Sequence, residues 1–249
     1  MKILLHACCG PCSLEPVRLL REAGHELAVY YANANIHPEA EYARRLDTLR
    51  AWARDEGIPV IEGTYDVAAW EAAAGRFGAS MDTREERCRA CYRLRLEETA
   101  RYAAAHGYDA VSTTLTVSPY QYTLVIEEEV RRAAEAAGIA AVFEDFRPQY
   151  DEATRRSRAL GMYRQNYCGC RYSAAEAARE RAERKAARAA RKAAEQAAHA
   201  DERAAEEAAR AKRKAERAAY DEAQARKHAV LKALRAQRKA EARAAKDAS

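Results

Sequence analysis

Short apolar runs alternate with helical patterns through the first 173 residues, and this order constrains the fold more than any other feature. Five runs have the length and composition of buried strands: KILLHACC, HELAVYYAN, IPVIEG, YDAVSTTLTV and IAAVFEDF. Between them lie segments whose apolar residues recur three and four positions apart. Strands separated by helices pair in parallel through crossovers. The pattern therefore predicts an α/β domain with a three-layer, Rossmann-like parallel sheet.

The first predicted strand runs into a turn that is rich in thiols. In LLHACCGPCS, Cys8, Cys9 and Cys12 occupy three of five positions, and we expect Ser13 to be the N-cap of the following helix. Ligands of such sheets collect beyond the carboxyl ends of the strands, where residues 33–37 and 112–119 should also lie. We therefore expect an active site at this edge.

The seven cysteines fall into three tight clusters within the first 170 residues: Cys8, Cys9 and Cys12; Cys88 and Cys91; Cys168 and Cys170. An odd number with adjacent thiols argues against a disulfide framework and favours metal ligation or redox chemistry. One structural zinc takes four ligands and would leave three thiols unexplained, whereas thiolates also hold iron-sulfur clusters, typically four to a cubane. The spacing alone leaves open a single zinc with buried spare cysteines.

After Tyr172 the composition changes to Ala, Arg, Lys and Glu. Residues 171–249 contain 22 Lys and Arg and 13 Asp and Glu, a net charge of +9, whereas the first 170 residues carry −4. The large aliphatics Val230, Leu231 and Leu234 are too few for a coiled coil. We expect a catalytic domain over 1–173 and a charged, helical or partly disordered tail over 174–249, with RNA or partner binding as an alternative. A chain cut after residue 173 should keep its fold.

No segment of the sequence has the pattern of a signal peptide, and none has eighteen consecutive apolar residues. We therefore expect a cytoplasmic protein that does not bind membranes.

Four separated motifs within residues 1–173 together resemble the cobalamin-independent epoxyqueuosine reductase family: LLHACCGPCS, RCRACYRLRL, STTLTVSPYQ and SRALGMYRQNYCGCRYS. The resemblance implies a HUP-like α/β fold and reduction of epoxyqueuosine to queuosine at the wobble position of tRNA, the final step of queuosine synthesis. It also implies a 4Fe-4S cluster beside a second iron ion. The partners would be a tRNA and an unidentified electron donor, and the oligomeric state is left open.

The resemblance further implies roles for individual residues. All seven cysteines would be metal ligands, with Cys12 at a position where some members carry Asp, while their division between cluster and second iron stays open. Apart from the resemblance, His6 and Tyr163 lie close in sequence to cysteine motifs, so the catalytic candidates are Cys8, Cys9, Cys12, His6 and Tyr163, although a buried structural role for His6 is an equal alternative. The substrate candidates are Thr114, Ser118, Tyr120, Gln121, Arg164 and Asn166.

Arginines crowd two of these regions, and we expect both groups to contact RNA phosphates. The first group surrounds the second cysteine motif and comprises Arg84, Arg87, Arg89, Arg93 and Arg95. The second comprises Arg155, Arg156 and Arg158.

Two other functions compete with the reductase. A PP-loop nucleotide-dependent tRNA-modifying enzyme needs a glycine-rich S-G-G-x-D-S type turn after the first strand, and this chain has A-C-C-G-P-C-S instead. A zinc-stabilised tRNA-binding module would use the same thiols without redox chemistry.

Overall fold

The computed structural model describes residues 1–247, with side chains to residue 235. The chain divides into two units, Met1–Glu180 and Arg181–Ser249. The first holds the sheet and all seven cysteines, and residues 181–247 of the second belong to one helix.

Five strands form one parallel sheet in the order β3-β2-β1-β4-β5. The strands are β1 (Lys2–His6), β2 (Glu26–Tyr31), β3 (Val60–Glu62), β4 (Ala110–Thr113) and β5 (Ala140–Ala141). This confirms the parallel α/β sheet. The last apolar run contributes less than the sequence suggested, because only two residues of IAAVFEDF pair with β4.

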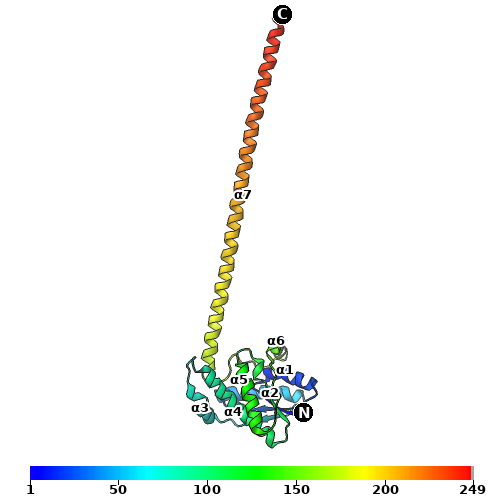
Figure 1. The fold of residues 1–249 in the computed structure, drawn as a ribbon, viewed down its shortest axis with the longest axis vertical. Coiled ribbons are helices and arrows are strands. Elements are labelled where there is room, and N and C mark those ends of the chain that lie inside the picture. The colour runs from blue at the N-terminus through cyan, green and yellow to red at the C-terminus, as the bar shows by residue number, and fades with distance from the viewer. Residues whose placement is uncertain (248–249) are drawn as a thin grey trace. The chain divides into compact units, whose positions relative to one another are not determined.

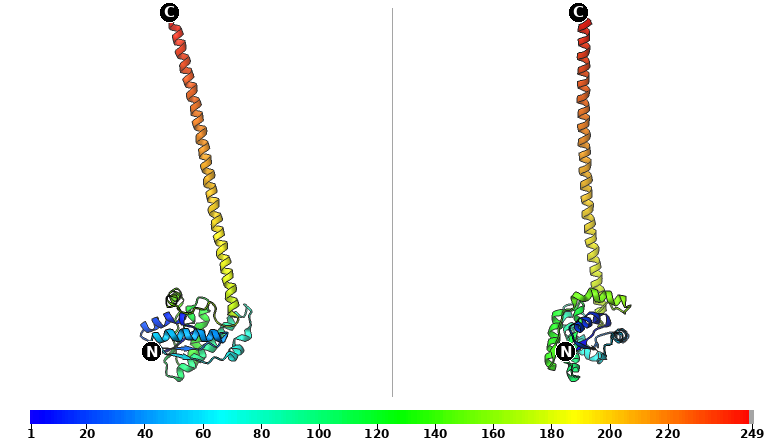
Figure 2. Two further views of the ribbon diagram at one scale, coloured as in Figure 1. Left: turned by 180° about the vertical axis from the view of Figure 1, so that it is seen from behind. Right: turned by 90° about the vertical axis from the view of Figure 1, so that its right-hand side faces the viewer.

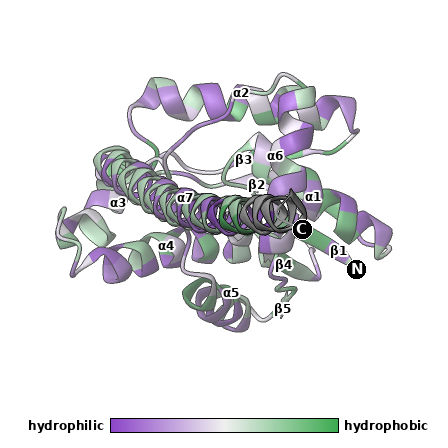
Figure 3. Ribbon diagram, turned by 90° about the horizontal axis from the view of Figure 1, so that it is seen from above, coloured by the Kyte–Doolittle hydropathy of each residue, from purple (hydrophilic) through white to green (hydrophobic). Residues whose placement is uncertain are grey.

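Helices cover both faces of the sheet (Figures 1 and 3). Successive strand residues point to opposite faces, so Leu5 of β1 packs with α1 (Gly10–Glu22) and α2 (Glu39–Asp55), and Leu4 with α4 (Arg84–Ala105) and α5 (Thr123–Ala137). Each face thus has its own apolar core. The order of strands reverses between β1 and β4, where sheets of this kind bind ligands.

Helix α1 begins at Gly10, so the expectation of Ser13 as its N-cap is wrong. Cys9 is the N-cap and Pro11 lies in the first turn, where proline is tolerated because its missing N–H has no helical partner. The Ser13 hydroxyl instead donates to the Cys9 carbonyl, 2.9 Å away. Cys9 and Cys12 are therefore both at the N-terminus of a helix.

Several short elements escape prediction because they are too short to show a period. They are α3 (Val67–Ala73), α6 (Tyr150–Ala159) and the 3-10 turns η1 (Gly75–Phe77), η2 (Leu115–Val117) and η3 (Arg147–Gln149). Helix α3 places the fully buried Trp70 against Cys91 and Cys170. Helix α6 is joined to α1 by the ion pair of Arg156 with the buried Glu15, 2.6 Å apart.

Helix α7 (Ser173–Asp247) is continuous across the two units (Figures 1 and 2). Its first residues belong to the sheet-containing unit, because Glu176 pairs with the buried Arg87 and lies 3.4 Å from Arg84. Arg84 also pairs with Glu180. The two units divide after Glu180, whereas α7 begins at Ser173, so a truncation should spare these two acids. The domain boundary after residue 173 stays a prediction.

Replacing Glu176 with Gln should destabilise the protein by about 3 kcal/mol, because removing one partner of a buried ion pair leaves the other charge uncompensated. Arg87 is only 1% exposed. Urea unfolding monitored by circular dichroism measures the loss. The exposed Glu183 on the same helix is the matched control, and E183Q should change the unfolding free energy by less than about 0.5 kcal/mol. Equal effects of the two substitutions would contradict the prediction.

None of the helices within the described residues combines the length and apolar character that crossing a membrane requires.

Candidate metal centre

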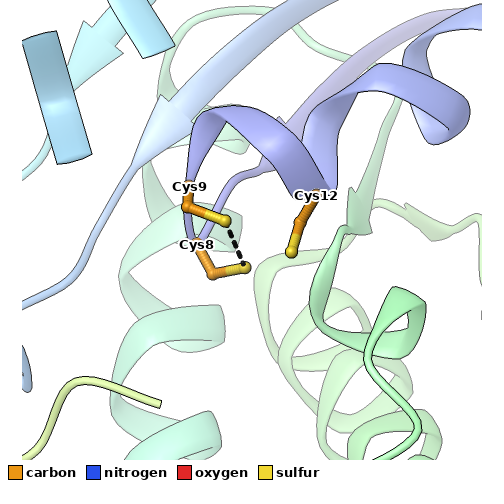
Figure 4. Close-up of side chains that lie close together, drawn as sticks. All are labelled: Cys8, Cys9 and Cys12. Carbon is orange, nitrogen blue, oxygen red and sulfur yellow. Dashed lines mark hydrogen bonds between the residues drawn. The ribbon is translucent and has the colours of Figure 1, made fainter. Parts of the chain in front are cut away.

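Three thiols meet where β1 passes into α1. The Sγ atoms of Cys8, Cys9 and Cys12 all lie within 4.8 Å of one another, and those of Cys8 and Cys9 are 3.9 Å apart (Figure 4). Thiolates bound at ~2.3 Å to one tetrahedral metal ion are about 3.8 Å apart. The arrangement therefore fits a single soft metal ion.

The three thiols differ in acidity. Cys9 is fully buried, and hydrogen bonds from Cys12 and then Cys8 hold the pKa of its thiol well below the usual range. Its place at the N-terminus of α1 favours a negative charge in the same sense. Hydrogen bonding within the trio raises the pKa of Cys12 instead. Cys9 is thus the thiol most readily available as a thiolate.

The other four cysteines form a second, looser group. Cys88 and Cys91 lie one turn apart within α4, and Cys168 and Cys170 lie in the segment before α7. Each of these thiols is close enough to the other three to interact electrostatically. Cys168 also interacts electrostatically with Cys8 of the first group, so all seven thiols lie in one region of the structure.

A buried arginine stands among the thiols. Arg95 is 2% exposed, with its Nε 3.0 Å from the carbonyl oxygen of Ala32 and a second nitrogen bonded to the Asn33 amide oxygen. Its guanidinium lies 4.0 Å from the Cys91 sulfur. No carboxylate within the described residues forms an ion pair with it, and the groups that face it are the sulfurs of Cys91, Cys168 and Cys8. The site can therefore accommodate a negatively charged group.

The proposed phosphate-binding role of the first arginine group is wrong for most of its members. Arg87 and Arg95 are buried, and Arg84 pairs with Glu176 and Glu180. Arg89 and Arg93 both pair with Glu129 of α5. In the second group Arg155 pairs with Glu152 and Arg156 with Glu15, while Arg158 is exposed.

His6 occupies a structural position. The side chain is completely buried, with Nδ1 2.9 Å from the Thr113 hydroxyl and Nε2 3.2 Å from the Ala32 carbonyl. Because a carbonyl only accepts, Nε2 carries the proton and Nδ1 accepts from Thr113. Burial, and secondly Arg95, lower the pKa of His6 to about 3. The imidazole is neutral and both nitrogens are occupied, which favours the buried structural role of His6 over the role of a catalytic acid.

The substrate candidates after β4 lie at different depths. Thr114 is buried beside the thiols, and its hydroxyl accepts from the Cys8 N–H at 3.1 Å. Gln121 accepts from the Tyr92 hydroxyl at 2.6 Å, and Ser118 caps the local turn. Tyr120 is 47% exposed and stands edge-to-face on Tyr150, with ring centroids 6.2 Å apart.

The candidates Tyr163, Arg164 and Asn166 make contacts within the fold, and the contacts described for Tyr163 and Arg164 are with residues other than the cysteines. The Tyr163 hydroxyl donates to Glu41 at 2.8 Å, and its ring stacks under Arg44. Arg164 is bound to Thr154 and Ser157 of α6. Asn166 has interactions of its own within the fold. None of the contacts described for Tyr163 and Arg164 reaches a cysteine, which does not favour a catalytic role for Tyr163.

Sequence reasoning did not single out three residues of the site. Tyr150 packs in the apolar cluster that includes Cys12. Gln165 hydrogen-bonds to Cys9, and its Oε1 is buried without a partner in the part of the chain described. Arg45, 2% exposed, donates to the Cys168 carbonyl at 2.8 Å. Arg45 forms an i,i+4 ion pair with Glu41. Such a pair is common on exposed helices, so the sequence does not indicate that Arg45 is buried.

Comparisons with known proteins identify a family for the chain. Residues 3–176 match the family model described as "Epoxyqueuosine reductase QueH". A protein of that name from Dehalococcoides mccartyi is 35% identical over 176 residues, which cover 70% of this chain and 93% of the relative. One from Thermotoga maritima is 33% identical over 73% of this chain and 94% of its own. A solved chain described as a predicted subunit of tRNA methyltransferase from Methanocaldococcus jannaschii gives a TM-score of 0.43 at 14% identity, covering 64% of this chain and 76% of that one.

Proposed function

The chain belongs to the epoxyqueuosine reductase QueH family, and on that premise we propose that it reduces epoxyqueuosine to queuosine in tRNA. The observation that carries the proposal is the convergence of seven free thiols at the carboxyl edge of the sheet. The reaction takes two electrons and two protons, breaks both C–O bonds of the epoxide, and leaves an alkene and water. Apart from the thiols, the side chains near the site do not supply electrons, and we assign this role to a redox cofactor.

We assign the two thiol groups to different metals. In a 4Fe-4S cubane each thiolate binds its own iron, so the sulfurs stand farther apart than around one ion. The looser group of Cys88, Cys91, Cys168 and Cys170 suits that cluster, and the tight trio of Cys8, Cys9 and Cys12 suits a second iron. When bound, this centre would supply electrons and a Lewis acid for the epoxide oxygen. Cys12 would replace an oxygen ligand with sulfur.

Protein side chains position the substrate in this proposal. Tyr120 and Tyr150 form an aromatic pair, and Tyr150 lies close enough to Cys12 for the two groups to interact electrostatically. A wobble base that leaves the anticodon stack is commonly held on such rings. The phenols also provide O–H groups for proton transfer near the trio, whereas His6 has no free nitrogen. Thr114 and Gln165 hold the sulfurs of Cys8 and Cys9 in place.

The test of the function is direct. Anaerobically purified protein with a chemical reductant should convert epoxyqueuosine in tRNA to queuosine, followed by mass spectrometry of the nucleosides. Expression in a host without any other such reductase should likewise remove the accumulated epoxyqueuosine. Colourless protein that holds stoichiometric zinc after anaerobic reconstitution with iron and sulfide, and leaves the epoxide intact, would instead support the zinc-stabilised module.

Replacing Tyr150 with Ala should lower kcat/KM for the tRNA about tenfold, since stacking of a base on an aromatic ring contributes ~1–3 kcal/mol. Steady-state kinetics at several tRNA concentrations measure the change. Tyr108, which contacts Lys2 at the opposite edge of the sheet, offers a matched control. The Y108A protein should keep its kcat/KM within about twofold. A Y150A protein with unchanged kinetics would remove the aromatic pair from the substrate site.

A further inference from the structure

Helix α7 beyond Glu180 is the largest part of the chain that the proposed reaction does not use. Every residue from 181 to 235 is exposed except the half-buried Gln224. This stretch contains 16 Lys and Arg and 9 Asp and Glu.

The basic residues are arranged on one side of the helix. Successive residues of an α-helix are 100° apart about its axis, and on that basis 14 of the 16 fall within a sector about 140° wide. An even distribution would place about six there. We call these fourteen residues the basic stripe: all Lys and Arg of residues 181–235 except Lys212 and Arg226.

The acidic residues do not follow the same pattern. Four of the nine share the sector of the basic stripe, which leaves that face with a net charge of +10 and the remaining surface with −3. Within the stretch, the i,i+4 pairs of Arg217 with Asp221 and of Arg191 with Glu195 neutralise only part of the stripe. Over the ~80 Å that 55 helical residues span, the stripe is a nearly continuous positive surface.

The opposite surface offers little to an apolar partner. The large apolar residues of this stretch are Tyr220, Val230, Leu231 and Leu234, all near its end, and the rest is mainly alanine. A coiled coil needs apolar residues at every heptad, and a helix lying on a membrane needs bulky apolar side chains opposite its basic face. Any ligand of this helix therefore has to be bound through its positive charges. This points to a polyanion as the ligand.

We propose that the basic stripe binds the sugar–phosphate backbone of the tRNA substrate. The choice of tRNA rests on the proposed function, and the one-sided charge identifies the ligand chemistry as phosphate. The stripe then anchors the RNA independently of its sequence, while the rim of the metal centre selects the modified base. The binding is electrostatic, so it weakens steeply as salt rises.

The test compares two full-length double variants that each lose two positive charges from α7. Arg210→Gln with Arg213→Gln removes two members of the basic stripe, and Lys212→Gln with Arg226→Gln removes the two basic residues outside it. Gln keeps a high helix propensity, and circular dichroism verifies the helix. Binding of unmodified tRNA transcript is measured between 50 and 300 mM salt.

The stripe variant should bind tRNA about three- to tenfold more weakly than the unsubstituted protein, with a salt slope reduced by about 1–2. The off-stripe variant should stay within about twofold. Equal weakening of the two variants overturns the proposal, as does preferential binding of the full-length protein to phosphatidylglycerol vesicles when tRNA competes. The reductase assay is separate: full-length protein that binds tRNA through the stripe yet leaves epoxyqueuosine intact would refute only the proposed function, and full turnover with equal variants would refute only the stripe.

Discussion

Replacing Cys9 with serine should remove one iron per protein and reduce epoxyqueuosine turnover at least about a hundredfold. Loss of residues that merely orient metal ligands commonly costs 10–100-fold, and Cys9 is proposed as a ligand itself. It is fully buried, and hydrogen bonds from Cys12 and Cys8 lower its pKa. A serine hydroxyl ionises far less readily and is a harder ligand. Elemental analysis and single-turnover assays under anaerobic conditions measure both effects.

The same variant tests the division of the thiols between two metals. If Cys88, Cys91, Cys168 and Cys170 hold the cluster, the brown colour and broad visible absorption should survive in the C9S protein while one iron is lost. Ser13 is a matched control, because it is equally buried one turn further along α1 and carries no sulfur. The S13A protein should keep its iron. Simultaneous loss of cluster absorption and iron in C9S would show that Cys9 belongs to the cluster.

The sequence was sufficient to predict the parallel sheet because its central strands β1, β2 and β4 are buried almost throughout and consist of apolar runs. Leu4 and Leu5 lie in opposite cores, so β1 shows no alternation, and this is typical of a strand covered on both faces. The fifth strand was overestimated because β5 lies at the edge, where apolar residues after Ala141 pack without pairing. The start of α1 was misplaced because cysteine at an N-cap has no strong propensity.

The thiols were predictable from spacing, but the surrounding charges were not. Five arginines around the second motif appear alike in the sequence, yet two are buried and the others pair with acids distant in the chain. The helical spacing of these residues did contain information about which of them share a face of α4. Cys88, Cys91 and Arg95 recur at three and four positions and share one face of α4, while Arg89 and Arg93 share another that meets Glu129. Only tertiary packing decides which face is inside.

Arg95 is a buried arginine with which no carboxylate of the described residues forms an ion pair. Burying a guanidinium is costly, and in most proteins an acid compensates for it. Here the groups that face it are the sulfurs of Cys91, Cys168 and Cys8, the Asn33 amide and the Ala32 carbonyl. A cluster held by four thiolates has a net negative charge and gains another on reduction. The positive charge of Arg95 should therefore favour cluster retention and the reduced state.

Replacing Arg95 with Gln should make the cluster harder to reduce, lower its retention during anaerobic gel filtration, and decrease turnover about ten- to a hundredfold. Removal of a nearby positive charge disfavours the more negative, reduced form, so the potential should become more negative. Arg95→Lys keeps the charge and should restore the potential more than the turnover, because lysine lacks the fork that reaches Ala32 and Asn33 together.

Arg93→Gln, two residues away on the face that meets Glu129, is the matched control. A redox titration followed by electron paramagnetic resonance distinguishes these outcomes, and an R95Q cluster with the potential of the unsubstituted protein would show that Arg95 serves only the packing of α4.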